Sequence, residues 1–390
     1  MTAVTIIFWI AAGVVFYTYL GYGLLLFVLV KIKEWFSPPR HRELPDVLPA
    51  VTLLIAAYNE EAVVKAKMEN CRSLRYPNLH IVWITDGSTD RTNTLLAEYA
   101  DVQILFEAKR GGKTAALNRS IDFLTTPLVV YTDANTMLNA DAIREIVRQF
   151  QDPAVGCVAG EKRVLDKENA TATATEGIYW KYESKLKEWD FRLYSAVGAA
   201  GELFAVRRDL YRKLPNDTLL DDFVLSMQIA GQGYKIAYCK QAYAMETPSA
   251  DMVEEGKRKA RIAAGGLQSI GRLLPLLNPF RYGVLAFQYF SHRVLRWSLT
   301  PVLLAALLPL NIALVAGGAE HTPLYTLLLL LQGVFYVAGF TGAWLARRGI
   351  KSKVLFVPYY FLFMNLNVFK GVGYLVKNNG QGAWEKAKRA

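Results

Sequence analysis

The sequence predicts an α/β domain with a mostly parallel sheet and with transmembrane helices on both sides of it. Between residues 51 and 150, short apolar runs rich in β-branched residues alternate with helical patterns, which is typical of parallel strands covered by helices. Near both ends of the 390-residue chain, apolar stretches are long enough to cross a hydrocarbon core of about 30 Å. We therefore expect a globular domain attached to a membrane.

The alternating pattern gives the expected elements in chain order, after a proline-containing linker at Ser37–Pro49. Strands are expected at Val51–Ala57, His80–Thr85, Val102–Phe106, Leu128–Tyr131, Val155–Ala159 and Leu203–Arg207, and helices at Glu60–Leu74, Thr92–Ala100, Lys113–Leu124, Ala140–Phe150, Ala170–Leu193 and from Asp221 onwards.

The composition is basic and apolar. Lys and Arg outnumber Asp and Glu by 45 to 34, which gives a formal net charge of +11, and 53% of the residues are hydrophobic. Much of the positive excess lies beside apolar runs, so it favours a membrane and an anionic substrate over nucleic acid. The three cysteines, Cys71, Cys157 and Cys239, lie far apart without metal-ligand spacing, which is typical of buried thiols in a reducing compartment.

The first apolar stretch, Thr5–Val30, is interpreted as an uncleaved membrane span. No charged side chain precedes it, whereas Lys31 and Lys33 follow it directly. A secretory signal has its basic residues before the apolar stretch, and Lys and Arg favour the cytoplasmic side of a span. The globular domain is therefore expected in the cytoplasm.

The C-terminal third predicts three further spans, at Leu299–Ala316, Leu324–Leu345 and Val354–Val376. The preceding segment, Pro275–Trp297, carries too many charges to span and is expected to be an interfacial amphipathic helix. Residues 317–322 contain no Lys or Arg and residues 346–353 contain four, which again places the globular domain in the cytoplasm.

The last apolar segment leaves two alternatives open. Asn365, Asn367 and Lys370 lie within it, and polar groups in a membrane are costly unless they face protein or water. A helix that lines a channel would explain them, and so would an interfacial or re-entrant helix. A full crossing would send the basic tail at residues 379–390 outside, which the charge rule disfavours.

Acidic residues follow several of the expected strands. Asp133 ends the run Leu128–Tyr131 and Asp86 ends His80–Thr85, where ligands bind in open α/β sheets. Asp133 and Asn135 offer hard oxygen ligands for Mg²⁺ or Mn²⁺ if a diphosphate supplies more. A turn or N-cap role is the structural alternative for each aspartate.

Three further positions suggest substrate contacts. Tyr58, after the first strand, offers a ring face for a base, and Asp86 offers acceptors for an imide N–H. The segment KRGGKT places a glycine pair before a helix, with Lys109, Arg110 and Lys113 around it, which suits a diphosphate, although a solvated basic loop would look the same. Glu107 stands where an ATP-binding loop needs glycine, so a Walker-type site is excluded.

The helix from Asp221 begins with two aspartates. Capping and the helix dipole explain one of them. A second carboxylate, at the edge of the sheet where ligands bind, could act as a general base towards a hydroxyl, and Asp222 is the candidate for this role. Asp221, beside it, is expected to contact the substrate.

The ordered motifs AAYNE, TDGSTD, GGKTAALN, TDANT, GELFAVRRD, LDDFVLSMQIAGQGY and RKAR (258–261) resemble the family 2 glycosyltransferases with a GT-A fold. The likeness is greatest to membrane-embedded enzymes of the poly-N-acetylglucosamine, hyaluronan, chitin-oligosaccharide and cellulose synthase type, and covers residues 51–266. It implies a domain that binds a nucleotide sugar, and a divalent metal, Mg²⁺ or Mn²⁺. The roles it implies are uridine binding by Tyr58, Glu60 and Asp86, donor phosphate contact by Lys113, metal binding by Asp133 and Asn135, general base catalysis by Asp222, and contact with the diphosphate and the acceptor entrance by Arg258 and Arg261.

Two positions depart from the family pattern. The metal motif contains Asn135 as its second ligand, which lowers its charge, and Ile262 replaces the tryptophan that helps to bind the acceptor in processive relatives. We therefore predict an inverting transferase that adds GlcNAc or glucose from a UDP-sugar to a growing β-linked polysaccharide, with possible coupling to export. A non-processive enzyme with a ceramide- or polyprenyl-type lipid acceptor is the first alternative, and an inactive membrane scaffold is the second. An accessory subunit remains unknown.

The resulting domain prediction is a membrane helix with its juxtamembrane segment at 1–36, a cytoplasmic catalytic domain at 45–270, an interfacial helix at 271–297, membrane helices at 298–378 and a basic tail at 379–390. The expected location is the cell membrane, as a multi-pass protein.

Overall fold

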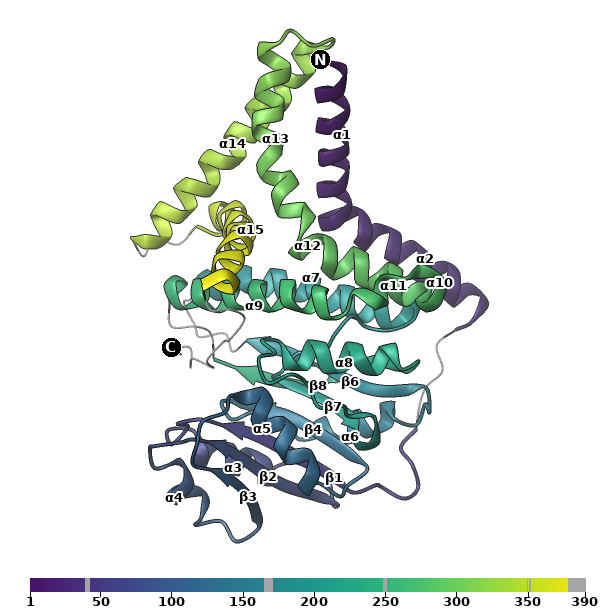
Figure 1. Cartoon of the computed structure of the whole chain (residues 1–390), viewed down its shortest axis with the longest axis vertical. Coiled ribbons are helices and arrows are strands. Elements are labelled where there is room, and N and C mark those ends of the chain that lie inside the picture. Colours follow the sequence, from purple (N-terminus) through teal and green to yellow (C-terminus); the bar gives the residue numbers. More distant parts are fainter. Residues whose placement is uncertain (39–42, 165–170, 248–250, 349, 351, 378–390) are drawn as a thin grey trace.

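The computed structural model describes residues 1–38, 43–164, 171–247, 251–348, 350 and 352–377. The predicted tail at 379–390 lies outside these residues. Figure 1 shows a layered molecule, with the sheet domain at one end and the long apolar helices at the other. Helices α7 and α9 lie between them.

The sheet domain contains one mixed sheet of eight strands in the order β3-β2-β1-β4-β7-β6-β8-β5. The parallel half, β1 to β4, follows the expected strands closely, and a mostly parallel α/β sheet is confirmed. The strand bounds are β1 Val51–Ala57, β2 Leu79–Asp86, β3 Val102–Glu107, β4 Leu128–Asp133, β5 Thr136–Leu138, β6 Val155–Val164, β7 Leu203–Arg207 and β8 Lys235–Glu246.

The second half of the sheet is more irregular than the sequence suggests. Strand β7 is antiparallel to both β4 and β6, while β6 and β8 are parallel with a register shift between Gly160 and Glu161. Strands β5 and β8, which pair with each other, were not expected. Strand β5 has only three residues, and β8 mixes lysine, glutamine and tyrosine without clean alternation, so neither produces a strong strand pattern.

The packing of the core explains why the sequences of β1 and β4 are continuous apolar runs. All seven residues of β1 are buried, because helices cover both faces of the parallel half. Leu54 and Val129 pack into the core on one face, and Leu53 and Val130 into the core on the other. This rigid centre holds the ends of β1, β2 and β4 at one edge.

The helices of the sheet domain are shorter than the sequence patterns predict, because several end in turns or 3₁₀ segments. Their bounds are α3 Val64–Arg72, α4 Thr92–Leu96, α5 Lys113–Ser120, η2 Ile121–Phe123, α6 Ala142–Gln149, α7 Thr171–Leu193, η3 Arg208–Leu210, α8 Asp221–Gly231 and α9 Met252–Arg272.

The predicted interfacial helix at Pro275–Trp297 is instead a chain of short helical pieces, namely η4 Leu274–Leu277, α10 Pro279–Tyr282, α11 Val284–Tyr289, η5 Phe290–Val294 and α12 Leu295–Trp297. A glycine with positive φ, Gly283, separates α10 from α11. The charged side chains of this segment, which argued against a membrane span, were expected on a polar helix face and lie elsewhere. His292 and Arg296 are buried against carboxylates of α7 instead of facing a polar surface.

Four long helices are apolar enough to cross a membrane in the described part of the chain. The first combines α1 Thr2–Phe16, the π-helical turn η1 Tyr17–Gly21 and α2 Tyr22–Phe36, and the others are α13 Leu299–Ala316, α14 Thr322–Arg347 and α15 Lys353–Lys377. Helix α1 packs on α13, and α14 on both α13 and α15. Figure 1 shows α1, α13 and α14 rising away from the sheet domain.

Helix α15 runs along α9. A Cβ on Gly371 would lie 2.8 Å from both Ala263 Cβ and the Ala264 nitrogen, and a Cβ on Gly256 would meet the Phe363 ring. Glycine at 371 therefore permits a backbone approach that a larger residue would prevent. Because α9 belongs to the layer beneath the membrane helices, this course favours the interfacial alternative for the last apolar segment.

Candidate active site

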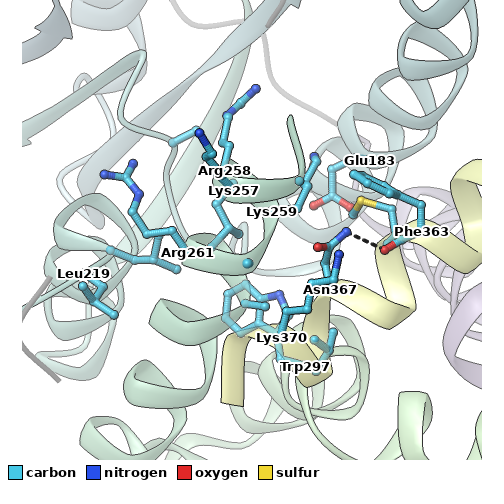
Figure 2. A pocket seen from close by; sticks show the side chains of 18 of the residues that line it. Glu183, Leu219, Lys257, Arg258, Lys259, Arg261, Trp297, Phe363, Asn367 and Lys370 are labelled. Atoms are coloured by element: carbon cyan, nitrogen blue, oxygen red, sulfur yellow. Dashed lines mark hydrogen bonds between the residues drawn. The ribbon is translucent and has the colours of Figure 1, made fainter. Parts of the chain in front are cut away.

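A cavity of about 1910 Å³ connects the ligand edge of the sheet with the long apolar helices. Among the predicted site residues, Glu60, Lys113, Asp133, Asn135, Asp221, Asp222, Arg258 and Arg261 line it. Figure 2 shows Arg258 and Arg261 of α9 near Asn367 and Lys370 of α15. The structure therefore brings together residues that are far apart in the chain, such as Glu60 and Lys370.

The turn between β4 and β5 presents Asp133 and Asn135 to this cavity. Thr132 and Thr136, on either side of the turn, have their hydroxyl oxygens 2.9 Å apart, and both oxygens lie within hydrogen-bond distance of the Glu202 carbonyl. Beneath them, the buried ammonium of Lys67 donates to Thr132 Oγ1 and to the Thr136 carbonyl. This polar support fixes the direction of Asp133.

Lys113, the first residue of α5, forms an ion pair with Asp133, with 2.7 Å between Nζ and Oδ1. Burial alone would lower the pKa of Lys113, but Asp133, Asp221 and Asp222 outweigh burial and raise it above its usual value. Lys113 is therefore a fixed cation. A Cβ on Gly201 would lie 3.3 Å from both Lys113 Nζ and Asp222 Oδ2, so glycine keeps this part of the site open.

Asp222 lies in the first turn of α8, where its Oδ1 accepts a hydrogen bond of 2.8 Å from the Phe223 amide. Burial and the adjacent Asp221 carboxylate raise the pKa of Asp222 to about 7, although Lys113 opposes this shift. A carboxylate with this pKa is basic enough to take a proton from a hydroxyl during reaction near neutral pH. The geometry and the pKa together suit a general base.

The edge of the sheet at Asp86 is more closed than the sequence suggests. Asp86 is buried, and both of its oxygens accept hydrogen bonds from the Gly111 and Gly112 amides at 2.6–3.1 Å. The glycine pair that we expected at a diphosphate therefore holds Asp86. Arg110, expected beside that diphosphate, lies 3.8 Å from the Tyr58 ring centre and covers one of its faces.

Tyr58 and Asp86 do not line the cavity itself, but they border its edge through their neighbours. Asn59 has a positive φ of 53°, which is uncommon for a residue other than glycine, and its side chain pairs with Thr89. This contact ties the ends of β1 and β2 together.

The two arginines of α9 differ in their contacts. Arg258 lies 3.6 Å from Glu202 and 3.5 Å from Glu255, so two carboxylates hold its guanidinium against the cavity wall. Arg261 makes no ion pair or hydrogen bond within the described residues and lines the same cavity. Arg261 is therefore available to bind an anion, while Arg258 is oriented in advance.

The oxygen ligands around Asp133 fit a divalent metal only in part. Within the described residues, no group of three or more His, Cys, Asp or Glu side chains could hold an ion. Asp133 Oδ2 and the Asn135 side chain have no hydrogen-bond partner in the described chain, and both face the cavity. One carboxylate and one amide are hard ligands of the right type, and phosphate oxygens from a donor could complete the set.

A protein-family model described as glycosyltransferase-like family 2 matches residues 49–265, more than half of the chain. The chain belongs to this family. The family 2 glycosyltransferase is also similar to beta-monoglucosyldiacylglycerol synthase of Nostoc sp., with 33% identity over 214 residues that cover 50% of this chain and 44% of the relative. It is 27% identical over 233 residues to poly-beta-1,6-N-acetyl-D-glucosamine synthase of Staphylococcus aureus, covering 57% of this chain and 55% of that one.

This family 2 glycosyltransferase spans about half the length of the curated relatives it matches. A solved structure of a mannosyltransferase from Pyrobaculum calidifontis, in complex with GDP-mannose and Mn²⁺, covers 95% of this chain and 99% of its own with a TM-score of 0.69 and 22% identity. The structural likeness confirms the GT-A-type fold with apolar helices at both sides.

Sequence reasoning missed several residues of the cavity wall, namely Glu183, Lys187, Gly201, Glu202, Arg293 and Arg296. Glu183 and Lys187 lie on α7, whose long pattern of Trp, Tyr and Lys gave no periodic signal of its own. Arg293 and Arg296 were assigned to a polar helix face. The available signal was the density of charge within an otherwise apolar segment, which indicates buried partners.

Proposed function

We propose that this family 2 glycosyltransferase transfers a sugar from a nucleoside diphosphate sugar, expected to be a UDP-sugar, to a hydroxyl of a membrane lipid. One observation supports a lipid as the acceptor. The cavity that contains Asp222 opens sideways between the apolar helices, where Phe16, Leu20 and Phe340 line it and are nevertheless 56, 57 and 68% exposed. A lipid can enter such an opening without leaving the bilayer.

The proposed reaction is a single displacement at the anomeric carbon. The acceptor hydroxyl oxygen forms the new bond, its proton goes to Asp222, and the bond between the anomeric carbon and the diphosphate oxygen breaks, so that the sugar is transferred with inversion. Lys113, Arg258 and Arg261 stabilise the charge that develops on the leaving diphosphate. Tyr58, Glu60 and Asp86 border the nucleoside, and Asp221 raises the basicity of Asp222.

A divalent cation, Mg²⁺ or Mn²⁺, is the proposed cofactor. Asp133 and Asn135 would hold it, and it would neutralise charge on the diphosphate when bound. We expect excess EDTA to reduce transfer at least about tenfold, because the protein supplies only part of the positive charge that a leaving diphosphate needs. Steady-state rates before EDTA and after readdition of Mg²⁺ or Mn²⁺ measure this. Full activity in EDTA, with the metal content verified, would mean that Lys113 and the arginines suffice.

A growing polysaccharide is the second candidate acceptor, and the aromatic wall favours it. Trp180, Tyr182 and Trp297 line the cavity and could stack on sugar rings. One observation argues against an exported polymer. In the most apolar stretch of each membrane helix, only 11–28% is buried within the protein, so these helices do not enclose a sealed path in the described chain.

The proposed setting is a cell membrane with the catalytic domain in the cytoplasm. The loop at 317–322, which is free of Lys and Arg, lies at the far end of the membrane helices, where Gly317 contacts Met1. The basic segment at the end of α14 lies on the side of the sheet domain. This distribution agrees with the excess of Lys and Arg expected on the cytoplasmic side.

The proposal is tested with the purified full chain in lipid nanodiscs. The protein is incubated with a panel of UDP-sugars and GDP-mannose, with diacylglycerol or a diacylglycerol glycoside as the acceptor, and the products are analysed by mass spectrometry. We expect one sugar to be added to a lipid from a preferred donor. Long sugar chains would favour the polysaccharide acceptor, and no transfer from any donor would contradict the proposal.

A further inference from the structure

The cavity wall carries a buried lysine that has no hydrogen-bond or ion-pair partner in the described part of the chain. Lys187, on α7, is 7% exposed and lines the cavity, and its ammonium makes no ion pair or hydrogen bond with any described residue. Lysine is almost never buried without a partner, because removing its charge from water is costly. A buried donor that faces a cavity indicates a ligand that supplies the missing acceptor.

Charges of both signs surround Lys187, since Arg293 opposes its positive charge while Glu183, Glu202 and Asp222 favour it. Arg293 and Arg296, which also line the cavity, share the single carboxylate of Glu183, at 2.5 and 2.8 Å. His292 lies against the same carboxylate, and its other nitrogen bonds to Asp190. The carboxylates that act on Lys187 already have other partners, since Glu183 pairs with both arginines, Glu202 pairs with Lys162 and Arg258, and Asp222 accepts from the Phe223 amide.

Lys187 comes from a different element than the groups proposed to bind the diphosphate. Those groups, Lys113, Arg258 and Arg261, come from α5 and α9, whereas Lys187 lies on α7. Because Asp222 is among the charges that influence Lys187 electrostatically, Lys187 lies within electrostatic range of the proposed base.

We propose that Lys187, supported by Arg293, binds an anionic group, a phosphate or a carboxylate, located near the hydroxyl that accepts the sugar. This inference rests on the proposed function and specifies its acceptor. The acceptor then carries a neutral hydroxyl, which Asp222 deprotonates, and a negatively charged group, which orients the acceptor in the cavity. Burial and Arg293 lower the pKa of Lys187, against the opposing effect of Glu183, Glu202 and Asp222, and an incoming anion would favour its charged form.

The two sources of the anion are separated by comparing acceptors. Phosphatidylglycerol offers a hydroxyl beside a phosphate, glucuronosyldiacylglycerol offers hydroxyls beside a carboxylate, and glucosyldiacylglycerol is the neutral counterpart. The full chain is assayed with each, and kcat/KM for the anionic acceptor is divided by kcat/KM for the neutral one. Whichever anionic lipid gives the larger ratio identifies the source.

Lys187→Met is expected to lower this ratio about tenfold to a hundredfold, the effect of a lost hydrogen bond to a charged group. Lys187→Arg should restore most of it. Lys185→Met, a change of an exposed lysine two positions away that pairs with Glu188, is the matched control and should leave the ratio unchanged. An unchanged ratio in Lys187→Met, an equal loss with both acceptors, or a higher KM for the donor would each overturn the inference.

A binding measurement keeps this test separate from that of the proposed function. Short-chain phosphatidylglycerol and a short-chain neutral diacylglycerol are titrated into wild type and Lys187→Met without donor, and the bound lipid is counted by native mass spectrometry. Preferential binding of the anionic lipid that is lost in Lys187→Met supports the inference even if no lipid is glycosylated. Equal binding to both proteins contradicts it, whatever the reaction proves to be.

Discussion

Replacing Asp222 by asparagine is expected to lower the rate of sugar transfer by about 10² to 10⁴, the usual contribution of a general base. Asparagine has nearly the same shape, and its carbonyl can still accept the Phe223 amide hydrogen bond, so the fold of α8 should be kept. Donor affinity should change little, because a general base acts on the acceptor hydroxyl and contributes little to donor binding. The measurements are steady-state transfer rates and a nucleotide-sugar binding titration on the same preparation.

The matched control is Asp122→Asn, which changes an exposed aspartate that pairs with Lys213 on the surface. Its transfer rate should equal that of the wild type. A rate for Asp222→Asn within about threefold of wild type would remove Asp222 from the role of base, since a base contributes far more than this. If donor binding fell together with the rate, Asp222 would instead act in donor binding.

The second large effect concerns stability. Glu183→Gln is expected to destabilise the protein by about 3–5 kcal/mol, because it removes the carboxylate that Arg293 and the buried Arg296 share. The positive charges of Arg293, His292 and Arg296 overcome the effect of burial and hold the pKa of Glu183 well below its usual value. The carboxylate is therefore charged at every pH of interest.

Thermal unfolding in detergent measures this effect, and a decrease of roughly 5–10 °C in the apparent midpoint is expected. Glu188→Gln is the matched control. It lies on the same helix and pairs with Lys185 in a more exposed position, so its midpoint should shift by less than about 2 °C. A Glu183→Gln midpoint equal to that of the control would mean that the buried cations are satisfied in another way.

The parallel half of the sheet and the membrane helices could be predicted because their signals are local. Strand β1 has the predicted bounds, since buried parallel strands appear as continuous apolar runs and need no information about their neighbours. Asp133 and Asp222 could be assigned to one site, because the ends of strands and the starts of the following helices meet at one edge of such a sheet. Their chemical roles stay predictions.

Other features depend on partners that are distant in the sequence. Strand β8 exists because β6 and β5 pair with it, although its own pattern is weak. The charges of residues 292–296 suggested a polar helix face, because the sequence alone does not reveal that Glu183 and Asp190 of α7 receive them. Arg110 and the glycine pair were assigned to a diphosphate for the same reason, since their contacts with Tyr58 and Asp86 arise only in the folded chain.

The pH dependence of kcat/KM for sugar transfer tests most directly that Asp222 is the base at the junction of the donor site and the membrane cavity. Because burial and Asp221 raise the pKa of Asp222 to about 7, its basic form is lost as the pH falls through this value. We therefore predict that kcat/KM of the wild type rises about tenfold per pH unit below pH 7 and levels off above it, as expected for one ionising group. The residual rate of Asp222→Asn should lack this inflection. A wild-type profile that is flat between pH 5 and 9, or the same inflection in both proteins, would contradict the assignment.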